Sequence, residues 1–290
     1  MRRREFIAGL SAAALPLAGR AQQSASPVIG VLGFFGPRPP KSPIDEAFRA
    51  GLAEGGFIEG RNLSIEYRWG RGNARQVANF AAELVSRPVA LIVALGALAP
   101  ARAARRATST IPIVFAYGGD PVKDGLVASF NRPGGNLTGM ISLTSELLGK
   151  RLDLLLKMVP RARKVGFLSG TSNYFAHEDQ TSAILAAGRA VGVEIMIVEC
   201  RDDRDYESAL VKMAEGGADA MILGSFALPN LEKVVPLAAL YKLPAIYPNR
   251  SFAHAGGLMS YDTDPVAMGR RLGSAYVARI LKGEARRVYP

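Results

Sequence analysis

Cysteine and histidine are almost absent from this chain of 290 residues, which holds one cysteine, Cys200, and two histidines, His177 and His254. A single cysteine cannot form an internal disulfide, so the fold has no disulfide framework. Three such residues also cannot supply the Cys/His constellation of a structural zinc site. Neither histidine has an obvious nucleophile beside it in the sequence. We therefore expect no metal and no other cofactor.

Motifs of catalysis are missing as well. The chain contains no G-x-S-x-G elbow, no H-E-x-x-H pair and no G-x-G-x-x-G turn. The run Gly149-Lys150-Arg151 is not a P-loop, because it lacks both the upstream glycine and the hydroxyl residue after the lysine. These absences argue against an enzyme, and dinucleotide binding has little support.

Long apolar runs are also lacking: beyond the N-terminus, no segment has eighteen uninterrupted apolar residues, as a membrane helix requires. Positive charge is in excess, with a formal net charge of +11, but it is spread along the chain. Only Arg102, Arg105 and Arg106 gather on one predicted helix face. Because nucleic-acid binding needs a concentrated basic stripe, we expect a solvated basic surface and no nucleic-acid partner.

The N-terminus has the organisation of an export signal. Arginines at positions 2–4 precede an apolar run at 6–18 and a small-residue exit at 19–21. The run Arg3-Arg4-Glu5-Phe6-Ile7 resembles the twin-arginine motif. We expect residues 1–21 to be a signal peptide and the mature protein to be periplasmic. The alternative is a disordered basic tail on a cytoplasmic protein.

Short apolar runs alternate with helix-length segments along the rest of the chain. Predicted strands lie at 27–35, 62–69, 89–95, 111–116, 137–143, 165–169, 193–198, 219–223, 244–247 and 257–261. Predicted helices lie at 43–55, 75–86, 100–107, 122–130, 146–159, 180–191, 206–214, 231–241 and 265–281. Such alternation predicts an α/β fold with parallel sheets. Because the pattern restarts near residue 164, we expect two doubly wound lobes with a cleft between them that closes by hinge motion.

The expected lobe boundaries follow from this restart. Lobe 1 would comprise residues 27–143 and 263–290, and lobe 2 residues 144–262. Within lobe 1, residues 111–139 carry the clearest ligand signal, since a buried apolar strand breaks there into Gly118-Gly119-Asp120-Pro121. Open α/β sheets bind ligands at the carboxyl ends of their strands. We therefore expect this loop to form one wall of the cleft.

Three ordered motifs resemble a known family. The first motif has three parts: Gly118-Gly119-Asp120-Pro121-Val122, then Gly125-Leu126-Val127, then the run from Arg132 to Gly139. The second motif is the spaced pattern from Arg49 to Asn62, and the third is the run from Ala107 to Phe115. With the export signal and the two lobes, they make the chain resemble the substrate-binding proteins of ABC importers, of the periplasmic binding protein type I fold. Within that fold the match is to the family with tryptophan- and tyrosine-binding members, and it covers about residues 27–283.

The resemblance implies a ligand between the lobes, contacted by loops that follow the strands. The candidate ligand-binding residues are Phe34, Phe35, Gly96, Tyr117, Gly118, Asp120, Thr144, Ser145, Asn173, Tyr174, Ser225 and Asn249. Backbone N–H groups and hydroxyls at helix starts suit a carboxylate, the aromatic rings suit an apolar wall, and Asp120 suits an amino group. Each also has a purely structural interpretation: the phenylalanines as core, and Asp120 and Asn173 as turn residues.

The expected function is therefore that of an exported solute-binding protein. It would capture a small ligand, preferably an amino acid or related carboxylate, and deliver it to an ABC permease in the membrane. We expect it to act as a monomer and to catalyse no reaction. Two alternatives stay open: a ligand sensor for a membrane receptor, and an exported α/β enzyme.

Overall fold

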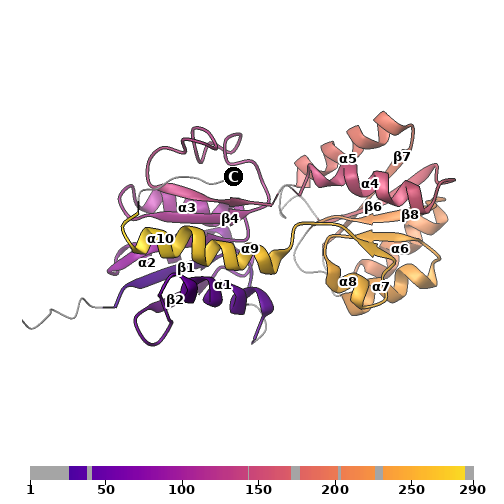
Figure 1. The fold of residues 1–290 in the computed structure, drawn as a ribbon. Coiled ribbons are helices and arrows are strands. Elements are labelled where there is room, and N and C mark those ends of the chain that lie inside the picture. Colours follow the sequence, from indigo (N-terminus) through magenta and orange to yellow (C-terminus); the bar gives the residue numbers. More distant parts are fainter. Residues whose placement is uncertain are drawn as a thin grey trace, which may run out of the picture.

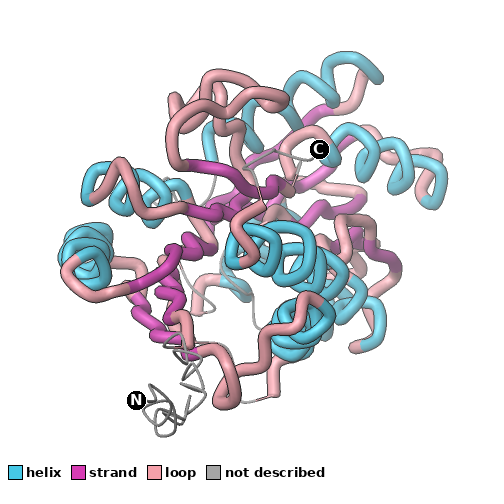
Figure 2. Tube along the Cα trace, turned by 60° about the vertical axis from the view of Figure 1, so that its left-hand side comes forward, coloured by secondary structure: helices cyan, strands magenta, loops and turns pink. Residues whose placement is uncertain are grey.

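Two parallel sheets with helices on both faces form the molecule, as a computed structural model shows for residues 26–37, 41–142, 144–170, 177–201, 204–225 and 231–284 (Figure 1). The two lobes lie beside each other, and in each the strands run through the middle between layers of helices (Figure 2). The predicted fold of two doubly wound α/β lobes is confirmed.

Lobe 1 is built on a five-stranded sheet in the order β2-β1-β3-β4-β5. The strands are β1 (Val28–Gly33), β2 (Ser64–Trp69), β3 (Val89–Leu95), β4 (Ile113–Tyr117) and β5 (Leu137–Ile141). Helices α2 (Ala74–Val85) and α3 (Leu98–Ala107) cover one face, and α1 (Pro43–Glu54) covers the other. Alternate side chains of β1 point to opposite faces of the sheet: Leu32 packs under α2 and α3, whereas Ile29 and Val31 pack under α1.

Lobe 2 repeats this plan with the order β10-β9-β8-β6-β7. Its strands are β6 (Lys164–Gly170), β7 (Glu194–Cys200), β8 (Ala220–Leu223), β9 (Ala245–Tyr247) and β10 (Met259–Ser260). Helices α4 (Leu147–Met158) and α5 (His177–Val191) cover one face. Helices α6 (Tyr206–Glu215), α7 (Leu231–Leu240) and the short α8 (Arg250–His254) cover the other.

The two sheets share one topology. When the strands of each lobe are numbered from its own start, both orders read 2-1-3-4-5. Such a sheet reverses its winding between its first and third strands, and the crevice outside their carboxyl ends is where these folds bind ligands. The ligand-binding ends are therefore expected between β1 and β3 in lobe 1, and between β6 and β8 in lobe 2.

The chain crosses twice between the lobes, and each crossing leads directly into a helix. After β5 the chain crosses at residues 142–146 and enters lobe 2 as α4, which packs beside α5. After β10 it crosses at residues 261–264 and enters lobe 1 as α9 (Pro265–Arg271), a π-helical stretch η1 (Leu272–Val277) and α10 (Ala278–Leu281). This helical run packs along α1, where it is drawn in yellow across lobe 1 (Figure 1).

Some local predictions were wrong. The segment predicted as a helix at 122–130 forms turns instead. Its turns are closed by several backbone bonds, among them Asp124 N to Asp120 O and Leu126 N to Pro121 O. Gly125, at φ +66°, takes the left-handed conformation that stops a helix. The segment after β9 was predicted as a loop but forms α8, because the side chain of Asn249 caps it by accepting from Ser251 N. In the described part of the chain, no helix is long and apolar enough to span a bilayer.

Candidate functional site

The loops after β1 and β3 meet at the carboxyl edge of lobe 1. Phe34 N donates to Leu95 O at 3.1 Å, which ties the first loop to the end of β3. The rings of Phe34 and Phe35 pack edge to face at 5.2 Å. Gly96 has φ +95°, and a methyl group on it would lie 3.2 Å from the Phe35 ring. A side chain at position 96 would thus be strained and would crowd Phe35.

The two phenylalanines occupy different environments. Phe34 is 9% exposed and belongs to the core between the sheet and α2 and α3, because it continues the face of β1 that carries Leu32. Phe35 is only half-buried and lies at the edge of that core. Of the pair, Phe35 is the one whose ring remains accessible to a ligand.

The loop after β4 is held by its own side chains. Tyr117 is buried, and its hydroxyl donates to Asp124 Oδ2 at 2.8 Å. Burial, together with the bond to Asp124, raises the pKa of Tyr117 far above its ordinary value, so the phenol stays neutral. Gly118, which follows, is buried as well. Tyr117 therefore anchors this loop, whatever its role toward a ligand.

Asp120 forms a turn in the same loop. Its Oδ1 accepts from Val122 N at 2.8 Å and from Lys123 N at 3.2 Å, as the structural interpretation of this residue requires. Its Oδ2 has no hydrogen bond within the described residues, and the side chain is partly exposed. One carboxylate oxygen is thus used by the turn, and the other remains accessible.

Basic residues of α3 fasten this loop from outside. Arg102 Nη2 donates to Asp124 O at 3.3 Å, and Arg105 Nη1 donates to Gly125 O. These carbonyls lie at the end of the turn that follows Asp120. Two of the three clustered arginines therefore have a structural role in holding this loop.

Thr144 and Ser145 lie in the first crossing, just before α4. Thr144 is buried, its N donates to Ser142 O at 2.6 Å, and its hydroxyl lies 3.2 Å from that same oxygen. Ser145 O accepts from Leu148 N at 3.3 Å in the first turn of α4. No described side chain caps α4, so the positive end of its helix dipole is the feature of this crossing that suits an anion.

The carboxyl edge of lobe 2 carries Ser225 and Asn249. Ser225 follows β8, and both its backbone groups pair with the amide of Gln180: Ser225 N donates to Gln180 Oε1, and Gln180 Nε2 donates to Ser225 O, each at 2.9 Å. Ser225 Oγ is buried and has no hydrogen-bond partner within the described residues. Asn249 follows β9 and caps α8. Asn173 and Tyr174 lie outside the described residues.

The topology brings the two carboxyl edges to the same place. The crossing at 142–146 leaves the carboxyl end of β5, and the crossing at 261–264 leaves the carboxyl end of β10. All strand pairs in both sheets are parallel. In each sheet, the loops that follow the strands therefore lie at the same carboxyl edge as the crossing that leaves that sheet. The described residues hold no group of three or more His, Cys, Asp or Glu that would bind a metal ion.

Comparison with known proteins agrees with this architecture. A family model described as "ABC transporter substrate binding protein" matches residues 38–288. The chain belongs to the family of ABC transporter substrate-binding proteins. The resemblance noted in the sequence is confirmed, and the family is one of solute-binding proteins and not of enzymes.

Relatives of this binding protein include a tyrosine-binding protein of Clostridioides difficile (strain R20291), 25% identical over 244 residues, which are 83% of this chain and 68% of the relative. A solved structure from Vibrio cholerae, called a conserved domain protein, has a TM-score of 0.73 at 25% identity and covers 89% of this chain and 86% of its own. An ABC domain from Streptococcus pneumonia in complex with L-Trp has a TM-score of 0.74 at 24% identity, over 91% and 88% of the chains.

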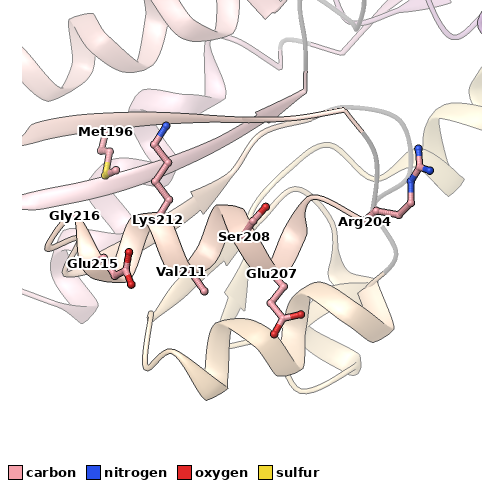
Figure 3. A pocket seen from close by; sticks show the side chains of 8 residues that line it. All are labelled: Met196, Arg204, Glu207, Ser208, Val211, Lys212, Glu215 and Gly216. Carbon is pink, nitrogen blue, oxygen red and sulfur yellow. The ribbon is translucent and has the colours of Figure 1, made fainter.

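A surface cavity of this binding protein lies away from the edges just described. It has a volume of about 810 Å³ and lies along α6 beside the edge strand β7 (Figure 3). Its lining residues are Met196, Arg204, Glu207, Ser208, Val211, Lys212, Glu215 and Gly216. Glu207 and Lys212 point to different sides, and Arg204 stands apart (Figure 3). Because its polar groups do not converge and none of the sequence-predicted site residues lines it, we do not assign it as the ligand site.

Sequence reasoning missed Gln180. This residue is 3% exposed and lies four residues before the fully buried Ile184 on α5, so both face the sheet. A polar amide on the apolar face of a helix was the available signal, since a buried amide needs partners. Arg151 on α4 gave the same kind of signal, because it stands among the apolar residues of its helix.

Proposed function

We propose that this substrate-binding protein captures a small solute between the carboxyl edges of its two lobes and delivers it to an ABC permease in the membrane. The observation that carries the proposal is the position of both crossings at these edges, in two sheets of identical topology. A solute bound there would contact loops from both lobes at once. Closing the lobes around it would involve no bond chemistry.

The proposed solute is an amino acid or a related carboxylate, and preferably an aromatic one. Lobe 1 offers Phe35 as an apolar wall and Asp120 Oδ2 for an amino group. Lobe 2 offers the start of α4, which no described side chain caps, for a carboxylate. The names of two relatives point the same way, since one is a tyrosine-binding protein and another is in complex with L-Trp. A structure from Bacillus halodurans with bound myo-inositol, at 14% identity and a TM-score of 0.68, shows that the fold alone does not select the solute.

A thermal-shift screen of residues 22–290 tests this proposal. We expect L-tryptophan or L-tyrosine to raise the melting temperature, because a ligand at 100 times its Kd adds about 2.7 kcal/mol of stability. D-tryptophan and myo-inositol serve as controls for the amino-acid contacts. A shift with a sugar alone would overturn the solute class. Turnover of a substrate without any shift would overturn the binding function.

The lobe boundaries and the export route are part of the same proposal. We place lobe 1 at residues 27–143 and 263–290 and lobe 2 at residues 144–262, and we expect a monomer in the periplasm. Residues 1–21, which lie outside the described residues, would direct export by the twin-arginine route. Replacing Arg3 and Arg4 together by lysine should leave the protein in the cytoplasmic fraction. Two results together would reject the twin-arginine assignment. The double variant would be exported as well as the wild type, and its export would stop when the general secretory route is blocked.

A further inference from the structure

A fully buried arginine lies where the chain crosses between the lobes. Arg151 is one turn into α4, which begins directly after the first crossing, and its exposure is 0%. Its Nε donates to Tyr261 O at 2.7 Å, and its Nη2 donates to Asp262 Oδ2 at 2.6 Å. Tyr261 and Asp262 form the start of the second crossing. One guanidinium therefore joins the two crossings.

Right after its contact with Arg151, the second crossing stops bonding to lobe 2 and begins bonding to lobe 1. On the lobe 2 side, Tyr261 N donates to Tyr247 O at 3.0 Å and extends the pairing of β10 with β9. Asp262 Oδ1 accepts from Thr263 N at 2.7 Å. On the lobe 1 side, Asp264 caps α9 by accepting from Val266 N at 2.9 Å. The backbone passes from lobe 2 contacts to lobe 1 contacts at Thr263.

The first crossing shows the same change. Ser142 N donates to Tyr117 O at 3.1 Å, which ties Ser142 to β4 of lobe 1. Thr144 and Ser145 already lie at the entrance to α4, whose Leu148 and Leu152 are buried in the lobe 2 core. The backbone thus passes from lobe 1 to lobe 2 just after Ser142.

Burial makes the arginine an unusual choice for a purely structural position. It lowers the pKa of Arg151 and raises the pKa of Asp262, while the attraction between the two charges opposes both shifts. Arg151 Nη1 is buried and has no hydrogen-bond partner within the described residues. Buried ion pairs contribute little net stability compared with apolar packing, and their best-attested use is to specify geometry.

The matching position in lobe 1 supports a special role. The helix that enters lobe 2 carries Gly149-Lys150-Arg151-Leu152, and the helix that enters lobe 1 carries the similar run Gly269-Arg270-Arg271-Leu272. Arg271 is exposed, whereas Arg151 is fully buried. Burial of this arginine is therefore not a general property of an entering helix.

We propose that Arg151 is a positioning residue for the motion between the lobes. It holds the second crossing against α4, so that both crossings move with lobe 2. The lobes then rotate about the lobe 1 ends of the crossings, at Ser142 and Thr263. The guanidinium suits this task because its planar fork donates to two acceptors from separate nitrogens in a fixed geometry, whereas a lysine has a single nitrogen at the end of a flexible stem. The proposal concerns the hinge and is independent of the identity of the solute.

The test compares Arg151→Lys with the wild-type protein and with Arg68→Lys, all without added solute. Arg68 is the matched control, because its Nη2 pairs with Glu83 Oε1 at 2.7 Å within lobe 1, away from the crossings. Spin labels are placed on cysteines introduced by Ala50→Cys on α1 and Ala239→Cys on α7, both exposed positions. Cys200 is 1% exposed and should stay unlabelled.

We expect Arg151→Lys to broaden the distribution of distances between the labels, while Arg68→Lys leaves it unchanged. Hydrogen exchange of the Thr263 amide should accelerate by about tenfold relative to the amides of β6, because one bond of a charged pair is lost. A fall in melting temperature with an unchanged distance distribution and unchanged exchange would overturn the proposal. If Arg151→Lys does not fold, Asp262→Asn, which removes the charge and keeps the shape, is read by the same two measurements.

Discussion

Asp120 uses one carboxylate oxygen in a turn, and its other oxygen has no hydrogen bond within the described residues. Asp120→Asn keeps the turn acceptor and removes the charge. We expect it to change the free energy of unfolding by less than about 0.5 kcal/mol. The affinity for L-tryptophan should fall about tenfold, which corresponds to roughly 1.4 kcal/mol for one lost ion pair. Calorimetric titration and urea unfolding check the two expectations; unchanged affinity would leave Asp120 as a turn former only.

Gln180 positions the loop after β8 through its two bonds to Ser225. Gln180→Glu is nearly isosteric, but it replaces the donor Nε2 by an oxygen that faces Ser225 O. We expect a loss of about 1–3 kcal/mol in unfolding free energy, since the part-buried carbonyl of Ser225 loses its donor and faces an oxygen instead. Gln76→Glu is the matched control, because Gln76 is exposed in the first turn of α2. Equal stability of the two variants would contradict the positioning role.

Tyr247 gives the folded protein a sensitivity to high pH. Burial raises the pKa of Tyr247 from 10.0 to about 12. Below pH 10 the phenol is protonated in both states. Between pH 10 and about pH 12 the unfolded chain loses the proton first, so stability falls as pH rises, by up to about 1.4 kcal/mol per pH unit. Urea unfolding at about pH 9 and about pH 11 should show a smaller loss in Tyr247→Phe than in the wild type. An equal loss would mean that the phenol titrates normally.

At the scale of elements, glycines allow the last helical run to pack closely on α1. A methyl group on Gly51 would collide with Arg270 O, and one on Gly273 with Phe48 O. These are backbone atoms, so the helices would have to separate to admit a side chain. Close contact between α1 and the run α9–η1–α10 therefore depends on these two positions having no side chain.

Gly273→Ala is thus expected to lower the free energy of unfolding by about 1–3 kcal/mol, as overpacking does. Gly149→Ala is the matched control in α4, where the nearest atom would lie 3.9 Å from the new methyl group. That change should stabilise the protein by about 0.5–1 kcal/mol, because alanine is the better helix former. The prediction fails if urea unfolding shows both variants shifting in the same direction.

At the scale of the whole molecule, the return of the chain to lobe 1 makes the lobes unequal as folding units. Lobe 2 has its entering helix, α4, at its own N-terminal end, so residues 144–264 contain all of its described elements. Lobe 1 takes its entering helical run from beyond lobe 2. Without that run, the face of the sheet that packs on Leu272, Tyr276 and Val277 would be open to water.

We therefore expect the fragment 144–264 to fold alone, and the fragment 26–143 to lack cooperative unfolding. Joining residues 26–143 to residues 263–284 by a flexible Gly/Ser linker should restore it, since the missing apolar contacts return. Circular dichroism and urea unfolding distinguish the outcomes. Cooperative unfolding of the fragment 26–143 by itself would show that the helical run is dispensable for lobe 1 and would argue against the proposed lobe boundaries.

The two-lobed fold was accessible from the sequence, because it rests on a pattern that repeats along the chain. The family was accessible because three ordered motifs resemble it. Apolar runs of strand length alternate with helix-length segments, and this periodicity reports burial directly. The helix predicted at 122–130 failed because single residues, Gly125 above all, ended the turn that Asp120 began. Such local conformations are weakly encoded in average propensities.

The amino-acid sequence by itself determined the fold class and the order of all the strands, and it predicts the loops in which a ligand site would lie. Only the tertiary structure decided which side chains of those loops are buried or bonded, as with Phe34 in the core and Tyr117 bound to Asp124. It also brought Arg151 to Asp262 and Gln180 to Ser225. The physical reason is range: periodicity is a property of neighbouring residues, whereas these contacts join residues 45 and 111 positions apart, whose meeting depends on how whole elements pack.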